Sequence, residues 1–126
     1  MGKNLAVQGC TLLIQGGTGP APTITNQPSS NIKVNGKGVF FGQIAFSLSG
    51  VIAGDIVTPT GSYPGTIQGT GANVLESSKK AVLEGDVSAT VTVRGTKPGP
   101  NGSQLPAQGN VTVKVSVAGQ TDVIAL

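Results

Sequence analysis

The chain has 126 residues with 20 glycines and 8 prolines, and only 10% of its residues are charged, so its length suits one domain with a modest hydrophobic core. The net charge of +3 comes from eight basic residues spread along the chain, without a basic run or interleaved aromatic residues, so nucleic acid is not a predicted partner. The chain has no histidine, which excludes catalytic arrangements that need one.

The first half of the chain predicts short strands separated by glycine and proline turns. Apolar and β-branched residues predict a strand over 5–14, which ends at two glycines, and a short strand over 23–25. Further strands around 32–34 and over 39–48 flank Asn35-Gly36, a dipeptide that strongly indicates a hairpin. No window in the chain has a convincing helical period.

The second half predicts strands joined by long loops. The stretches 58–71 and 97–109 are rich in glycine and proline and are expected to be exposed loops. A strand is predicted over 82–94, followed by one over 111–117 in which valines alternate with polar residues, and a last short strand over 121–126. The first of these strands should place one set of side chains on each face: Val87, Ala89, Val91 and Val93 opposite Ser88, Thr90, Thr92 and Arg94. We therefore predict an all-β fold, with one compact domain over 1–126 built from short strands and long Gly/Pro-rich loops.

Three stretches share a loose pattern of lysine, four variable residues, glycine, and then glutamine or aspartate. A glycine before a short amide or carboxylate suits a tight bend between strands, where a positive φ is needed. The alternative is a chance match, because glycine and valine are common in this chain. As loose pseudo-repeats, the three copies supply our candidate partner-binding residues: Lys37, Gly42, Gln43, Lys80, Gly85, Asp86, Lys114, Gly119 and Gln120.

Few side chains offer reactive chemistry. Cys10 is the only cysteine and has no evident base or metal-ligand partner, so we expect a buried thiol, unless a symmetric or partner-completed site brings several copies together. Glu84 and Asp86 fall on one side of the predicted strand as a carboxylate pair would, but a solvated turn beside Lys79 and Lys80 is the favoured interpretation. We predict no catalytic residue, no metal and no cofactor, hence no enzyme.

Several stretches carry a resemblance to a known family. Ala6–Leu12, followed by Gly16–Pro22, is similar to the opening of the PAAR-repeat and PAAR-like tip proteins of contractile injection systems and phage tails, in which a small β-segment with cysteine precedes a Gly-Pro turn. Ile32–Val39 resembles the family's stretch of valine, any residue and Asn-Gly-Lys. Lys80–Asp86 resembles its stretch of lysine, small residues and Gly-Asp.

The resemblance implies a compact β-rich cone that caps a trimeric spike and forms a membrane-piercing point. It implies three partners: the trimeric spike protein of the same particle, effector cargo and, transiently, the target membrane. Family members often bind an apical metal through histidine and cysteine, but this chain has no histidine and only Cys10, so the metal is not carried over. We predict a structural, non-enzymatic tip or cap protein.

The sequence also allows other hypotheses for the function. The first alternative is another structural subunit of a phage or tail-like particle, such as a tube, decoration or capsid-associated protein, and copy number separates it from a cap. An immunoglobulin-like adhesin lacks support from a core tryptophan or an export signal. A sugar-binding or hydrolytic enzyme would want aromatics and paired carboxylates. With no signal peptide evident before Cys10, we expect cytoplasmic synthesis and then assembly into a particle.

Overall fold

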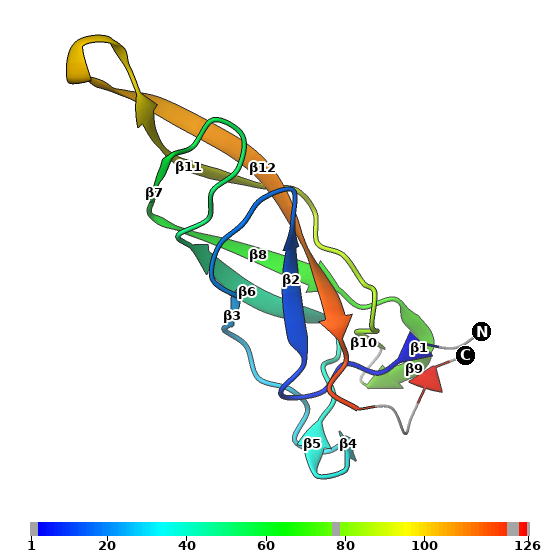
Figure 1. The fold of residues 1–126 in the computed structure, drawn as a ribbon. Helices are drawn as coiled ribbons and strands as arrows, with labels where there is room; N and C mark the ends of the chain where they lie inside the picture. The colour runs from blue at the N-terminus through cyan, green and yellow to red at the C-terminus, as the bar shows by residue number, and fades with distance from the viewer. Residues whose placement is uncertain (1–2, 77–78, 121–123, 126) are drawn as a thin grey trace.

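The computed structural model describes residues 3–76, 79–120 and 124–125 and confirms the all-β prediction. Among these residues the one helical element is a short 3-10 turn, η1 (Pro100–Gly102). Figure 1 shows an elongated molecule with a long hairpin at one end and both chain termini at the other. We call these the hairpin end and the terminal end.

One sheet of four strands runs along the molecule in the order β2-β12-β11-β7. Its central strand, β12 (Gln104–Val117), is long enough to pair with β11 (Val91–Pro98) over its first half and with β2 (Thr11–Gln15) over its second. The fourth strand, β7 (Thr58–Thr60), pairs with the outer part of β11. Alternate β12 valines, Val111, Val113 and Val115, are buried, as the alternation predicts.

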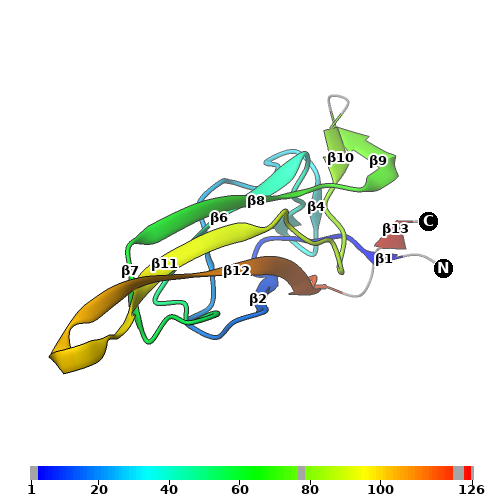
Figure 2. The ribbon, with the colours of Figure 1, turned by 90° about the horizontal axis from the view of Figure 1, so that it is seen from above.

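A second sheet covers the first, with strand order β3-β6-β8. It consists of β3 (Thr23–Ile24), β6 (Gln43–Ser49) and β8 (Ser62–Gln68). Figure 2 shows β6 and β8 on one side and β2 and β12 on the other. The main hydrophobic core lies between these layers, with Phe46 of β6 among its largest fully buried side chains. A Cβ at Gly65 of β8 would collide with the Phe46 ring, so glycine is required there.

Three two-stranded ribbons occupy the terminal end. The first pairs β1 (Lys3–Asn4) with β13 (Ile124–Ala125), so strands from the two ends of the chain lie side by side. The second is the hairpin of β4 (Lys33–Val34) and β5 (Lys37–Gly38), and the third pairs β9 (Gly71–Glu76) with β10 (Lys79–Ala81). The second ribbon confirms the predicted hairpin, since Asn35 and Gly36 both have positive φ, 53° and 79°.

Both predicted long loops are wrong. The stretch 58–71 contains β7, β8 and the first residue of β9, and 97–109 is mostly the β11–β12 hairpin. Proline misled the prediction: Pro59 and Pro64 lie in β7 and β8, the outermost strands of their sheets, where a missing N–H costs no ladder bond.

The predicted strand over 82–94 is wrong in its first half. Regular strand begins at Val91, and the residues before it change phase: Val87 is exposed while Ser88 is buried. Ser88 is held by β12, because its N–H donates to the Val113 carbonyl at 2.8 Å and its Oγ accepts from the Val113 N–H at 2.9 Å. A register shift between Val115 and Val117 likewise turns Val117 outward at the end of β12.

Candidate docking site

Three short segments at the terminal end close a ring of backbone hydrogen bonds. The Ala6 N–H donates to the Val82 carbonyl at 2.8 Å, and the Val82 N–H donates to the Phe40 carbonyl at 2.9 Å. The Phe40 N–H then donates to the Ala6 carbonyl at 3.0 Å, which completes the cycle. Each segment therefore plays the same part toward the next, as three strands related by a three-fold axis would.

A second cycle surrounds the first at matching positions. In each segment the residue two places after the centre donates its N–H to the carbonyl two places before the centre of a neighbouring segment, in the opposite direction around the ring from the first cycle. The three bonds are Gln8 to Gly38 at 2.9 Å, Gly42 to Lys80 at 2.7 Å and Glu84 to Asn4 at 2.9 Å. Between the two cycles, each pair of segments also forms one antiparallel bridge. The three bridges are Val7–Val39, Phe41–Ala81 and Leu5–Leu83. We call Leu5–Val7, Val39–Phe41 and Ala81–Leu83 the pseudo-three-fold ring.

The pseudo-three-fold ring separates two apolar clusters. Its central residues, Ala6, Phe40 and Val82, belong to the main core between the sheets. Their neighbours point the opposite way because side chains alternate along a strand, and they build a second cluster with Val34: Leu5, Val7, Val39, Ala81 and Leu83, with Phe41 packed against it. The ring is therefore a buried plate, with apolar packing on both of its faces.

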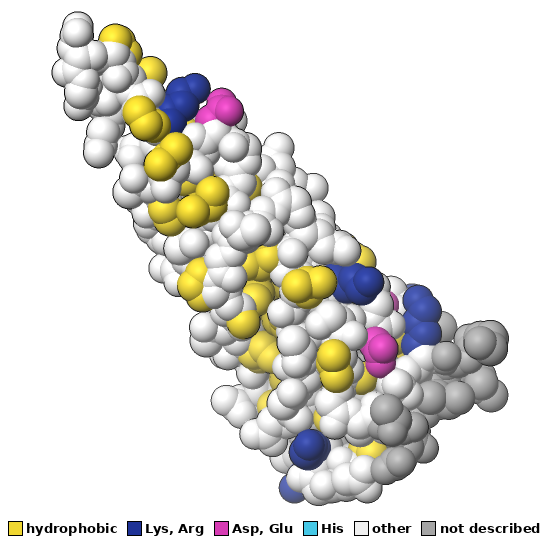
Figure 3. Space-filling model, viewed as in Figure 1, with side chains coloured by type: hydrophobic (Ala, Val, Ile, Leu, Met, Phe, Trp, Pro, Cys, Tyr) yellow, Lys and Arg dark blue, Asp and Glu magenta, His cyan; other side chains and the backbone are white. Residues whose placement is uncertain are grey.

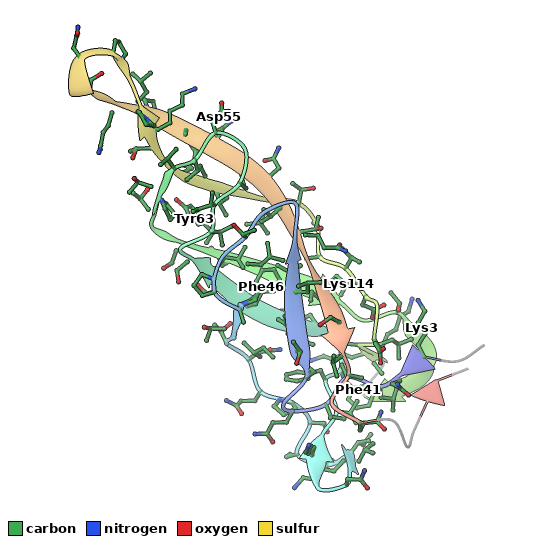
Figure 4. The ribbon with its side chains drawn as sticks, in the orientation of Figure 1. Lys3, Phe41, Phe46, Asp55, Tyr63 and Lys114 are labelled. Atoms are coloured by element: carbon green, nitrogen blue, oxygen red, sulfur yellow. The ribbon has the colours of Figure 1, made fainter. Side chains whose placement is uncertain are left out.

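Each ring segment is preceded in sequence by one strand of a ribbon, and each of these strands contains a lysine. Lys3, Lys37 and Lys79 lie three residues before Ala6, Phe40 and Val82, on β1, β5 and β10. All three lysines are exposed, and none forms an ion pair with another described residue. Figure 3 shows several basic side chains at this end of the molecule, and Figure 4 shows Lys3 at β1.

A glycine with positive φ follows each ring segment, directly at Gly42 and after one intervening residue at Gly9 and Gly85. The values are 90° at Gly9, 82° at Gly42 and 93° at Gly85, a conformation that residues other than glycine adopt with difficulty. After the first and third segments the chain makes the same tight turn, in which Cys10 donates to the Val7 carbonyl and Asp86 to the Leu83 carbonyl, both at 3.0 Å. The predicted positive-φ glycine is confirmed at Gly42, at Gly85 and also at Gly119, where φ is 93°.

The third predicted repeat is assigned to the wrong part of the chain. The ring contains the predicted copy at Lys37 and the one predicted at Lys80, the latter shifted by one residue because Lys79 is the true equivalent of Lys37. Its third member starts at Lys3, not at Lys114. The sequence signal was a lysine followed, after one residue, by three apolar residues, with a glycine one or two positions later. The three apolar runs are Leu5-Ala6-Val7, Val39-Phe40-Phe41 and Ala81-Val82-Leu83. The match at Asn110–Gln120 instead belongs to β12 and the chain after it.

The segment after β12 still packs against the ring. The Ala118 carbonyl accepts from the Val7 N–H at 3.0 Å, and a Cβ at Gly119 would lie 3.1 Å from the Val7 side chain. The buried Gln120 amide donates to the Leu5 carbonyl at 2.9 Å. Gly119 and Gln120 therefore fasten the first ring segment from outside.

The other predicted partner-binding residues divide into exposed and buried groups. Lys37, Gln43 and Lys80 are exposed, and Gly85 and Lys114 line a shallow groove with Lys3. Asp86 is buried, and its carboxylate accepts from the Leu83 N–H at 2.8 Å and from the Thr70 hydroxyl at 2.6 Å. This bonding makes Asp86 a brace for the turn after the third segment.

Glu84 and Asp86 do not share a partner. Glu84 accepts from the Asn4 side-chain amide at 3.0 Å, on the first ribbon, whereas Asp86 bonds inside its own turn and to Thr70. The two carboxylates therefore join different parts of the terminal end. Over residues 3–76, 79–120 and 124–125, no group of three or more His, Cys, Asp or Glu side chains is placed to hold a metal ion.

Cys10 is a free, half-buried thiol beside the main core. Burial raises its pKa from 9.0 to about 11, which keeps it protonated at neutral pH and slows its reaction as a nucleophile.

Comparison with family models, with curated proteins and with solved structures found no match to this chain. In the part of the chain that the structure describes, no helix is long and apolar enough to cross a membrane.

Proposed function

We propose that this protein is a structural, non-enzymatic cap that docks on the trimeric spike of a contractile injection system or phage-like tail and aids membrane puncture. The observation that carries the proposal is the pseudo-three-fold ring, in which Ala6, Phe40 and Val82 exchange equivalent hydrogen bonds in a closed cycle. The resemblance to PAAR-like tip proteins leads to the same architecture from the sequence.

The pseudo-three-fold symmetry of the terminal end matches that of a trimeric partner. Three identical subunits around an axis present three identical contact surfaces at their common end. A single chain can engage all of them equally only if it repeats one arrangement three times around that axis. The ring and its three ribbons supply such an arrangement at one end of this chain.

The packing of the ring also suits a mechanical role. Each ring segment is hydrogen-bonded to both others and buried between two apolar clusters, so moving one segment breaks bonds to two partners at once. Burial of every central residue, at 3% exposure or less, adds the stabilisation of a tightly packed core. A cap that transmits force from a spike needs this resistance to local opening.

The proposal is tested by locating the protein in purified particles. We expect one copy per particle, at the distal end of the spike, in averaged electron micrographs and by quantitative mass spectrometry against the spike subunit. Dozens of copies along the tube or on the shell would contradict a cap and favour the alternative, a tube, decoration or capsid-associated subunit.

A further inference from the structure

The ribbons at the terminal end hold most of the basic side chains of the protein. Of eight Lys and Arg residues in the chain, the ribbons contain Lys3, Lys33, Lys37, Lys79 and Lys80. Glu84 and the buried Asp86 are the acidic residues with described side chains there, and the side chains of Glu76 and Asp122 lie outside the described part. The hairpin end differs, because the sequence from Pro98 to Val113 has no charged residue.

Three of these lysines are equivalent under the pseudo-symmetry. Lys3, Lys37 and Lys79 each lie three residues before a ring centre and one residue before a carbonyl of the outer hydrogen-bond cycle. Their cross-strand partners, Ala125, Val34 and Glu76, lie on the second strands of the three ribbons. The same positive charge is thus presented three times, once on each ribbon.

We propose that the terminal end is the docking end, and that Lys3, Lys37 and Lys79 each face a carboxylate repeated on the three subunits of the spike. The inference deepens the proposed function and rests on it: it specifies the docking end and the chemistry of the partner. Identical subunits offer the same side chain three times, so one acidic residue per subunit matches all three lysines.

Charge pairs of this kind set orientation and speed of docking more than they hold the complex together. Exposed lysines attract the acidic end of a spike before contact. Three equal ion pairs favour binding along the three-fold axis of the spike over binding at a tilt. A competing role for the lysines is protection of the short ribbon edges against pairing with other chains. That role predicts aggregation of lysine variants, with no change in affinity for a spike.

The test measures binding to the purified trimeric spike of the same particle. The variants are Lys3→Glu, Lys37→Glu and Lys79→Glu, singly and together, and the double variant Lys37→Glu/Lys79→Glu. The matched control is Arg94→Glu/Lys97→Glu, which makes the same change of charge on β11. Four of the five positions are exposed and Lys97 is half-buried in an ion pair with Asp55, and unchanged thermal unfolding confirms that each variant folds.

We expect each single reversal to weaken binding by a similar factor, about threefold to tenfold, and the triple by about a hundredfold. The control should change binding less than twofold, and the wild-type affinity should fall as salt rises. A triple variant that binds as tightly as wild type, or a control that loses as much as its matched double, overturns the lysine inference and leaves the cap in place. Three clearly unequal single effects also overturn it. A wild-type protein that does not bind the spike at all overturns the proposed function itself.

Discussion

At the terminal end, ring segments that are far apart in sequence hold one another in a closed cycle, whereas at the hairpin end β11 and β12 are sequence neighbours joined by a turn at Gly99–Ser103. The ring is buried between two apolar clusters, but the outer hairpin has exposed residues such as Leu105 and few partners beyond its own two strands. One end of this protein is therefore built from contacts between residues far apart in sequence, and the other from pairing of neighbouring strands. The first should govern stability and docking.

The largest effect should come from removing the ring's aromatic centre. Phe40→Ala should lower the free energy of unfolding by about 3–5 kcal/mol, because it deletes a side chain that is 3% exposed and leaves a cavity. Urea unfolding measures this loss. The control Phe40→Leu keeps most of the volume and should cost about 1.5 kcal/mol. A loss below about 1 kcal/mol for Phe40→Ala would show that the ring does not anchor the fold.

The next contrast compares an acidic residue from each end. Asp86→Ala should lower the free energy of unfolding by about 1–3 kcal/mol, because it leaves the Leu83 N–H and the Thr70 hydroxyl without the carboxylate that accepts their hydrogen bonds. Asp55→Ala near the hairpin end removes an exposed ion pair with Lys97, at 3.4 Å, and should cost less than about 1 kcal/mol. Chemical denaturation of the two variants checks the order, and equal losses would contradict the comparison.

A smaller effect should appear at high pH through Cys10. Its folded pKa of about 11 lies above its ordinary value of 9.0, so between these pH values the folded state keeps its proton while the unfolded state loses it. Stability is therefore full below pH 9 and falls as pH rises toward 11, by about 1 kcal/mol after allowance for the exposed part of the thiol. Comparing unfolding of wild type and Cys10→Ser across this window measures the slope. A difference in the free energy of unfolding that does not change with pH would show that burial does not raise the pKa of the thiol.

The smallest effect should come from the hairpin end. Leu105→Ser changes a side chain that is 39% exposed and should alter the free energy of unfolding by less than about 0.5 kcal/mol. Differential scanning calorimetry can resolve the shift. A large loss here would mean that the outer hairpin packs against something more than its own two strands.

Local patterns in the sequence predicted the parts of the fold that depend on local structure. Alternating valines correctly placed Val111, Val113 and Val115 in the core, and Asn35-Gly36 correctly predicted a hairpin. The same reasoning failed where a local signal has two meanings. Proline at 59 and 64 indicated a loop, but an edge strand accepts proline equally well.

The candidate site was only partly predictable, for a related reason. The ring depends on single bridges between segments such as Leu5–Val7 and Ala81–Leu83, whose spacing in sequence carries no regular period. The repeat of lysine and glycine marked two ring segments but missed the segment after Lys3, because five residues separate Lys3 from Gly9 and Cys10 follows, whereas Lys114–Gln120 fits the pattern. The run of three apolar residues at Leu5–Val7 distinguishes the true third member, since Ser116 interrupts the corresponding stretch after Lys114, and the hydrogen bonds of the ring establish it.

The most direct test of the cap proposal is the mass of the complex obtained when the purified protein is mixed with the proposed trimeric spike. The pseudo-three-fold ring predicts one copy per trimer, so the complex should exceed the free trimer by 12.4 kDa in native mass spectrometry. Three copies per trimer would contradict the claim, since each spike subunit would then bind a chain of its own and the internal three-fold arrangement would serve no docking purpose.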